Sequence, residues 1–216
     1  YYFQPIVRAS DGSVYGYEAL MRYEGRMHLS PLDILECAQT LNRMYDIEKI
    51  TFNCVLDQVD YRYEFFKGKK VFINSLPKYR LNDNDRACVS EKLEKSRGQI
   101  VVEFTESSEF SDADLKTQID DYARLDVEVA LDDYGSGYSN VNNLIRYNPQ
   151  YVKIDRMLIS NIHTNAQKQH FVKSIISYSK ENNILSLAEG VETSEELSCV
   201  ISLGVDLIQG YYTGYP

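Results

Sequence analysis

Short runs of β-branched and aromatic residues recur along this chain, and most are followed by a longer segment with apolar residues at helical spacing. This alternation predicts βα units around a parallel sheet. Eight strands in a chain of 216 residues suit a closed (β/α)8 barrel of the TIM type. The eight runs are YYFQPIV, SVYGYEAL, KVFINSL, QIVVEF, VEVALDD, YVKID, ILSLAEG and DLIQGYY.

The connection between the first two runs departs from this regular pattern. It reads Ala-Ser-Asp-Gly over residues 9–12. A short Asp-Gly connection favours a β-hairpin, because a parallel crossover needs about a dozen residues or more. We therefore predict a modified α/β barrel whose first strand is antiparallel to the second.

Helices are expected between the strands, several of them starting at a capping-type residue. The segment from Ser30 to Lys67 should form two, over residues 31–45 and 46–67. The expected helix starts lie near Pro31, Asp85, Ser111, Ser139, Thr164 and Ser194.

Composition excludes several classes of protein. The four cysteines lie far apart and the three histidines form no HExxH motif, so neither a disulfide framework nor a zinc site is expected. We expect a reducing, intracellular setting. There is no apolar run near the roughly 18 residues of a membrane span and no signal-peptide pattern. A net charge of −9 argues against binding DNA or RNA polymers.

Polar residues stand where seven of the predicted strands end. In a barrel these ends open onto one face, where barrel enzymes place their chemistry. A single acidic residue there is more often a solvated end or a helix cap than a ligand, but agreement across seven strands favours a shared site. The residues are Glu18, Asn74, Glu103, Asp132 with Asp133, Lys153, Glu189 and Gln209.

Carboxylates that converge on one mouth would repel one another, and divalent cations are the natural compensation. Ligation by oxygen atoms alone favours Mg²⁺, Mn²⁺ or Ca²⁺. Adjacent strand residues face opposite sides, so Asp132 and Asp133 can both reach the site only if the strand ends there. Gly135 and Gly137 follow at once, and they indicate either a mobile loop over a ligand or a plain βα turn.

Lys153 is expected to stay protonated among these acids, so it suits holding a water or phosphate oxygen better than acting as an amine nucleophile. The alternative is a structural ion pair, for example with Asp155. Together the residues suggest two-metal hydrolysis of a phosphate ester. Residue types alone leave single-metal enolate chemistry open, and a lyase that uses Lys153 as a Schiff base fits the acidic surroundings poorly.

An ordered set of motifs carries a family resemblance. The chain resembles the EAL domain, a bacterial phosphodiesterase family that cleaves cyclic di-GMP to the linear dinucleotide pGpG, and the match spans almost its whole length. The matching motifs are QPIV from Gln4, YEALMR from Tyr17, FIN from Phe72, EFTE from Glu103, DDYGSGYSN from Asp132, VKID from Val152, AEGVET from Ala188 and QGYYTGYP from Gln209.

The resemblance implies a role for each matching residue. Glu18, Asn74, Glu103 and Asp132 correspond to the ligands of one metal, with Asp132 bridging to a second metal held by Asp133. Lys153 resembles the lysine that hydrogen-bonds the attacking water, and Glu189 an acid that assists, so the implied catalytic set is Lys153, Glu189, Glu18 and Asp132. The implied substrate contacts are Gln4, Leu20, Arg22 and Gln209, and the implied loop anchors are Glu106 and Glu192.

The resemblance also implies cofactors and partners. Two Mg²⁺ or Mn²⁺ ions are expected, with Ca²⁺ binding but not supporting turnover. Residues 1–216 would form one EAL phosphodiesterase domain of a longer bacterial protein with sensor or GGDEF-type domains, in the cytoplasm or as the cytosolic part of a membrane-anchored protein. A homodimer is expected, and no contact of this domain with a membrane. The alternative function is a cyclic di-GMP receptor without useful turnover.

Overall fold

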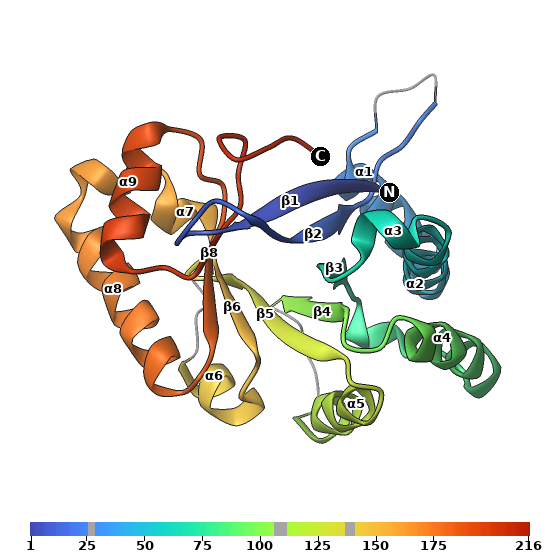
Figure 1. Cartoon of the computed structure of the whole chain (residues 1–216). Coiled ribbons are helices and arrows are strands. Elements are labelled where there is room, and N and C mark those ends of the chain that lie inside the picture. The colour runs from blue at the N-terminus through green and yellow to red at the C-terminus, as the bar shows by residue number, and fades with distance from the viewer. Residues whose placement is uncertain (26–28, 106–111, 137–140) are drawn as a thin grey trace.

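The structure is a computed structural model that describes residues 1–25, 29–105, 112–136 and 141–216. Eight strands close into a barrel and follow one another in sequence order, as Figure 1 shows. This confirms the predicted fold class. The strands are β1 (Tyr2–Arg8), β2 (Val14–Leu20), β3 (Lys70–Asn74), β4 (Ile100–Thr105), β5 (Glu128–Tyr134), β6 (Tyr151–Ile154), β7 (Leu185–Ala188) and β8 (Leu207–Ile208).

Strand β1 runs antiparallel to both of its neighbours, β2 and β8, whereas the other neighbouring strands are parallel. The predicted hairpin is therefore confirmed. In its register Gln4 lies opposite Glu18. The reversal brings the first residues of β1, rather than its last, to the end of the barrel where the parallel strands finish.

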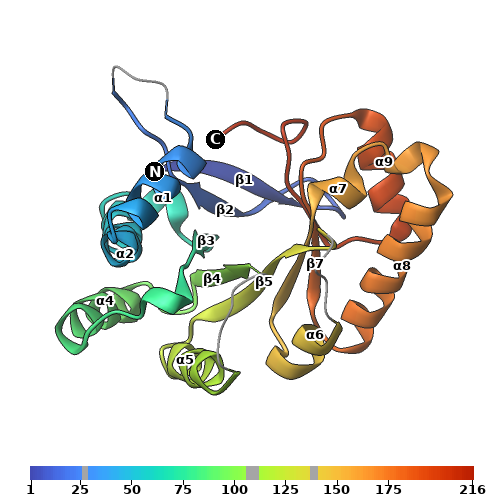
Figure 2. The ribbon, with the colours of Figure 1, turned by 180° about the vertical axis from the view of Figure 1, so that it is seen from behind.

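Helices surround the barrel, with α2, α4 and α5 on one side and α8 and α9 on the other (Figures 1 and 2). None of the described helices is long and apolar enough to cross a membrane. The described helices are α1 (Pro31–Thr40), α2 (Met44–Tyr61), α3 (Tyr63–Phe66), α4 (Asp83–Lys95), α5 (Asp112–Arg124), α6 (Val141–Tyr147), α7 (Arg156–Ile159), α8 (Ala166–Glu181) and α9 (Ser194–Leu203), with the 3₁₀ turns η1 (Pro77–Tyr79) and η2 (Ile162–Thr164).

The predicted boundary between the first two helices was wrong. Helix α1 ends at Thr40, and Asn42 then takes a left-handed backbone conformation with φ of 54°. Because left-handed conformations cannot continue a right-handed helix, the chain turns there and α2 starts at Met44. The second predicted helix also breaks, at Arg62, so its last turn is the separate helix α3.

Two of the other helix starts follow from capping. Asn82 accepts a hydrogen bond from the Asp85 backbone N–H, so α4 starts at Asp83 rather than at Asp85. At α9 the predicted start is confirmed, because Thr193 and Glu196 form a reciprocal capping box.

The interior of the barrel contains an apolar layer to which seven strands each contribute one side chain. In β2 this level is taken by Gly16, where an added Cβ would lie 2.5 Å from the Lys70 carbonyl oxygen. Side chains alternate between the two faces of a strand, so the inward residue two positions further on occupies the next level. The layer consists of Ile6, Phe72, Val101, Ala130, Tyr151, Leu187 and Leu207.

Candidate functional site

The next level of the barrel is polar in every strand. Each residue lies two positions beyond the apolar layer or Gly16 along the parallel strands, and two positions before it in the antiparallel strand β1. Six of them, all except Asn74 and Glu189, are only 1–7% exposed. The structure thus gathers residues predicted from seven strand ends, and adds one from β1. The level consists of Gln4, Glu18, Asn74, Glu103, Asp132, Lys153, Glu189 and Gln209.

Lys153 stands at the centre of this level. Its Nζ lies 2.6 Å from Glu103 Oε1, 2.8 Å from Glu189 Oε1 and 3.1 Å from Asp132 Oδ1. Glu18 Oε1 is more distant, at 3.7 Å. One ammonium group therefore faces four carboxylates that come from four different strands or strand ends, so negative charge exceeds positive charge in the centre of the site.

Glu18 is surrounded by amide groups as well as by Lys153. Asn74 Nδ2 donates to Glu18 Oε1 at 2.9 Å, and Gln209 Nε2 donates to Glu18 Oε2 at 2.6 Å. Gln209 also donates to Gln4 Oε1 at 3.0 Å, and Gln4 donates to the Gly214 carbonyl oxygen at 3.0 Å. This network fixes the orientation of Glu18 and ties the last residues of the chain to β1.

Strand β5 brings two adjacent aspartates to the site through a backbone irregularity that the sequence did not predict. The strand does not end at Asp132; its pairing with β6 shifts register between Leu131 and Tyr134. Asp133 has a left-handed backbone with φ of 56°, and its N–H donates to Asp132 Oδ1 at 2.9 Å. Such a bulge can aim neighbouring side chains toward the same face.

The crowded carboxylates have shifted pKa values. Burial and the neighbouring acids raise the pKa of Glu103 and Glu189 well above the ordinary range, although Lys153 opposes the shift. Burial and Asp132 raise the pKa of Asp133 to about 6. For Glu18 burial raises the pKa, but attraction to Lys153 and the hydrogen bonds from Gln209 and Asn74 outweigh it, and the net shift is downward.

The pKa of Lys153 is raised well above its usual value. Burial lowers it, but Asp132, Glu103, Glu18 and Glu189 together raise it more. The side chain therefore carries its proton at neutral pH. A protonated amine has no free electron pair, so this environment disfavours the Schiff-base chemistry considered above.

The donor set fits hard divalent cations. Glu103 is 1% exposed, and neither of its carboxylate oxygens has a hydrogen-bond partner among the described residues; Oε1 has the close ion pair with Lys153 but not the angles of a hydrogen bond. Ligand oxygens of Asp132, Asp133 and Glu189 lie within 4.8 Å of one another. Buried acceptors without donors, and clustered carboxylate oxygens, are suited to Mg²⁺, Mn²⁺ or Ca²⁺.

Two cavities flank the acidic cluster, and Glu18 and Asp133 line both. The larger, of about 620 Å³, is also lined by Leu20 and Arg22, and the smaller, of about 290 Å³, by Gln4 and Gln209. The four predicted substrate contacts therefore lie on both sides of the cluster. Arg22 is exposed, and its Nη1 donates to the Met21 carbonyl oxygen at 2.8 Å.

Of the two predicted loop anchors, Glu192 belongs to the described residues and Glu106 does not. Glu106 lies outside the described residues, as does the loop segment 137–140 that it was predicted to anchor. Glu192 lines the smaller cavity and forms an ion pair with Arg156 at 2.9 Å. Both assignments therefore stay predictions.

Sequence reasoning missed two residues near the site. Arg156 lines the smaller cavity with Glu192. Glu48 is 2% exposed behind the larger cavity, where it accepts hydrogen bonds from Ser75 Oγ and from the Leu76 N–H, each at 2.7 Å. A signal for Glu48 was available, because it shares the buried face of α2 with Met44 and Phe52, at helical spacing.

Comparison with known proteins gives a consistent family. A sequence model of the EAL domain matches residues 1–216. The "Probable cyclic di-GMP phosphodiesterase PdeN" of Escherichia coli is 27% identical over 220 residues, which cover 99% of this chain and 42% of PdeN. The "Bifunctional diguanylate cyclase/cyclic di-GMP phosphodiesterase MucR" of Pseudomonas aeruginosa is 28% identical over 228 residues, covering 100% of this chain and 32% of MucR. The chain thus spans less than half the length of either relative.

A similar solved structure contains ligands. It is the manganese and cyclic di-GMP complex of Klebsiella pneumoniae BlrP1, with a TM-score of 0.85 and 26% identity, covering 97% of this chain and 53% of BlrP1. Another structure of BlrP1 is a calcium and cyclic di-GMP complex. Both the fold and the ligands of this relative are compatible with the acidic cluster described above.

Proposed function

The chain belongs to the EAL domain family, and on this premise we propose that it hydrolyses cyclic di-GMP to linear pGpG at the mouth of the barrel. The observation that carries the proposal is the buried Lys153 with four carboxylates around its Nζ, at 2.6 to 3.7 Å. The relatives named as cyclic di-GMP phosphodiesterases support the choice of substrate.

Glu18, Asn74, Glu103 and Asp132 would hold one divalent cation, and Asp132 and Asp133 a second. When bound, such cations favour the deprotonation of water and neutralise charge that develops on a phosphate. Mg²⁺ or Mn²⁺ would support turnover, and Ca²⁺ would bind without doing so. The calcium complex of BlrP1 supports binding of Ca²⁺ to this type of site.

The residues of the chain bind and orient the reactants. The protonated Lys153 would donate a hydrogen bond to the attacking water and hold it in place, and Glu189, 2.8 Å from Lys153 Nζ, would assist by accepting a proton. Arg22 would pair with a phosphate of the substrate, while Leu20 contacts it from the same side. Gln4 and Gln209 would contact the substrate in the smaller cavity, so that the phosphodiester lies over the acids.

We also propose that residues 1–216 act as one domain of a longer bacterial protein with sensor or GGDEF-type domains, working in the cytoplasm. The small share of PdeN and MucR that the chain covers supports this. A homodimer through the helix that follows the glycine loop is part of the proposal. Ile145 of α6 is 62% exposed, so Ile145→Asp should convert a dimer to a monomer in sedimentation analysis.

Turnover of cyclic di-GMP by the purified chain tests the proposal. With Mn²⁺ we expect pGpG, and with EDTA or with Ca²⁺ alone we expect none. Lys153→Ala should bind cyclic di-GMP nearly as the wild type does but should not form pGpG. Normal turnover by Lys153→Ala would overturn the role of this lysine. Tight binding by the wild type with Mn²⁺ and without any pGpG would instead favour the receptor function.

A further inference from the structure

A third cavity, away from the acidic cluster, lies between helices α4 and α5. It has a volume of about 300 Å³ and an apolar wall formed by Phe52, Leu81, Val89, Leu93 and Leu125. Tyr122 adds a further ring, which stacks on Phe52 with centroids 6.5 Å apart. The volume is at the lower end of the range of small-molecule sites.

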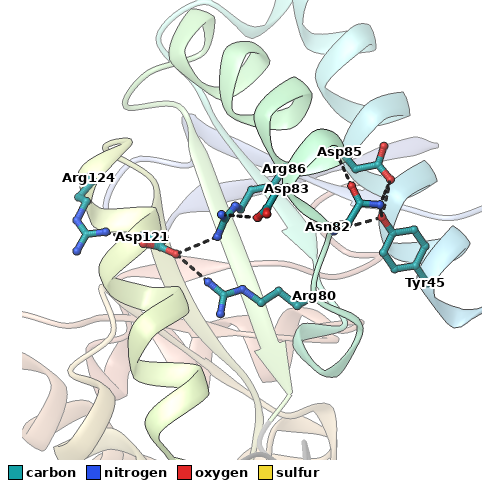
Figure 3. Close-up of polar contacts among 8 residues, drawn as sticks. All are labelled: Tyr45, Arg80, Asn82, Asp83, Asp85, Arg86, Asp121 and Arg124. Atoms are coloured by element: carbon teal, nitrogen blue, oxygen red, sulfur yellow. Dashed lines mark hydrogen bonds and ion pairs between the residues drawn. The ribbon is translucent and has the colours of Figure 1, made fainter.

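Three arginines surround one aspartate at the edge of this cavity. Arg124 Nη1 lies 2.6 Å and Arg80 Nη2 lies 3.1 Å from the Asp121 carboxylate, and Arg86 Nη1 is 3.8 Å from it, as Figure 3 shows. Arg86 also pairs with Asp83, at 2.9 Å. All three arginines and Asp121 line the cavity. In a chain with a net charge of −9, the described residues at this edge carry more positive than negative groups.

Among the described residues, the arginines have donors to spare for a further anion. A guanidinium group offers five N–H donors in a planar fork, and a carboxylate has only two oxygens. Asp121 shares its two oxygens among three guanidinium groups. An anionic group at this edge would therefore form charge-assisted hydrogen bonds, which are stronger than neutral ones.

Glu48 forms the inner end of the cavity and separates it from the larger cavity at the acidic cluster. It lines the cavity between α4 and α5. Its two carboxylate oxygens accept from Ser75 Oγ and the Leu76 N–H, and Ser75 and Leu76 line the cavity at the cluster. Asn74, a predicted metal ligand, directly precedes them. One buried side chain thus connects the two spaces.

We propose that the cavity between α4 and α5 binds a small aromatic monoanion, whose ring lies against Phe52 and Tyr122 and whose anionic group meets Arg80, Arg86 and Arg124. Occupancy would restrict Glu48 and, through Ser75 and Leu76, hold Asn74 in place. The bound ligand would then raise the affinity of the acidic cluster for divalent cations. This second part rests on the proposed metal site, whereas binding itself does not.

Calorimetric titration of the metal-free chain with 1-naphthoate tests the site. We expect saturable binding with a Kd below about 1 mM. The double variant Arg80→Gln with Arg124→Gln should bind at least tenfold more weakly, and so should the neutral analogue 1-naphthalenemethanol with the wild type. Arg43→Gln, at an exposed arginine outside the cavity, should bind as the wild type does. Absent binding, or equal losses in both arginine variants, would overturn the site.

Filling the cavity with a larger side chain gives an independent test of its location, with the test and control substitutions both on helix α4. Ser90 lines the cavity, whereas Cys88 is exposed and does not. Ser90→Phe should lower 1-naphthoate affinity at least tenfold, and Cys88→Phe should leave it unchanged. Circular dichroism should show that both variants keep the helical content of the wild type. Undiminished binding by a folded Ser90→Phe variant would contradict the location.

The connection to the acidic cluster is measured by Mn²⁺ affinity with and without saturating 1-naphthoate. We expect Mn²⁺ to bind at least threefold more tightly when 1-naphthoate is bound. By linkage, Mn²⁺ should raise the affinity for 1-naphthoate by the same factor. Glu48→Ala should bind 1-naphthoate but lose this factor. Unchanged or weaker Mn²⁺ binding would overturn the connection while leaving the cavity as a site. Neither result depends on turnover of cyclic di-GMP.

Discussion

The two ends of the barrel interior both contain polar groups, but their bonding differs. At the end where the parallel strands begin, the Tyr15 and Tyr151 hydroxyls lie 2.6 Å apart, Tyr151 donates to Glu128 Oε2 at 2.6 Å, and Lys70 Nζ pairs with the same oxygen at 2.7 Å. At the end where they finish, Glu103 oxygens lack hydrogen-bond donors among the described residues, and four carboxylates share Lys153.

This difference indicates what each end is for. A buried polar group whose hydrogen bonds are all formed stabilises one conformation. A buried polar group without a hydrogen-bond donor has lost its contacts with water, and this loss destabilises the folded state. Such a cost is expected where a ligand completes the set. The first end therefore has a structural role, and the second has a donor set that could hold ions. Substitutions at the two ends should have opposite consequences for activity and stability.

The largest expected effect follows from Glu103→Gln. Turnover of cyclic di-GMP should fall at least about 10³-fold, because loss of a proposed, charged metal ligand would remove several kcal/mol of stabilisation from the reaction. The free energy of unfolding of the metal-free protein should change by only about 1 kcal/mol, because loss of the ion pair with Lys153 is offset by the relief of repulsion from Glu18 and Asp132. Assays with Mn²⁺ and urea unfolding in EDTA measure the two quantities. If the Glu103→Gln variant kept full activity but its metal-free form were much less stable, this end of the barrel would have a structural role instead.

Glu48 should make the folded protein less stable at higher pH. Burial raises its pKa from the ordinary 4.5 to about 7, despite the hydrogen bonds from Ser75 and Leu76. The folded state then binds the proton more tightly than the unfolded chain, so stability falls as the pH rises from about 4.5 to about 7. At about 1.4 kcal/mol per pH unit this amounts to about 3 kcal/mol.

Urea unfolding of the wild type and of Glu48→Gln at pH 5 and pH 8 isolates this contribution. Other raised acids also titrate in the wild type, so the difference between the two proteins is the relevant quantity. We expect the variant to lose less stability between the two pH values. Equal losses would show that Glu48 does not titrate in this window.

Tyr151→Phe should destabilise the protein without affecting catalysis. The substitution removes the hydroxyl that joins the partly buried Tyr15 and Glu128, and a hydrogen bond of this kind contributes about 0.5–1.5 kcal/mol. The free energy of unfolding should decrease by this amount, while kcat for cyclic di-GMP stays within about twofold. A loss of kcat at unchanged stability would assign this end of the barrel a catalytic part.

The smallest effect is expected for Lys70→Gln. Lys70 and Glu128 are 21% and 31% exposed, so water screens their ion pair. Partly exposed ion pairs of this kind contribute at most about 1 kcal/mol. The loss of stability should be smaller still at 1 M salt, where the Debye length is about 3 Å. A salt-independent loss above that size would mean that the lysine stabilises mainly through its hydrogen bond to the Gly98 carbonyl oxygen.

Sequence predicted the barrel from the alternation of strand and helix patterns, and the antiparallel first strand from the short Asp-Gly connection. It predicted the convergence of the polar residues from their positions at the strand ends. All three are local patterns. The strand Ile100–Thr105 agrees within one residue with the run QIVVEF, whereas the run DLIQGYY extends four residues beyond the end of β8 at Ile208. The helix limits near Asn42 were missed, since the conformation of a single residue decided them.

Other features depend on contacts between distant segments. Asp132 and Asp133 were expected to require the end of a strand, but β5 continues past them with a register shift that depends on its pairing with β6. Glu48 and Ser75 meet across 27 positions, and the α4–α5 cavity needs three separate helices. Local patterns do not specify such packing.

The reversed direction of β1 has a further consequence for how such a domain can be joined to others. Tyr1 lines the larger cavity at the acidic cluster, and Gly214 accepts a hydrogen bond from Gln4 beside the smaller one. In Figures 1 and 2 the two chain ends lie near each other. A polypeptide attached ahead of the first residue or behind the last would emerge beside the cavities at the acidic cluster. A displacement of either attachment would therefore act directly on the residues that line these cavities.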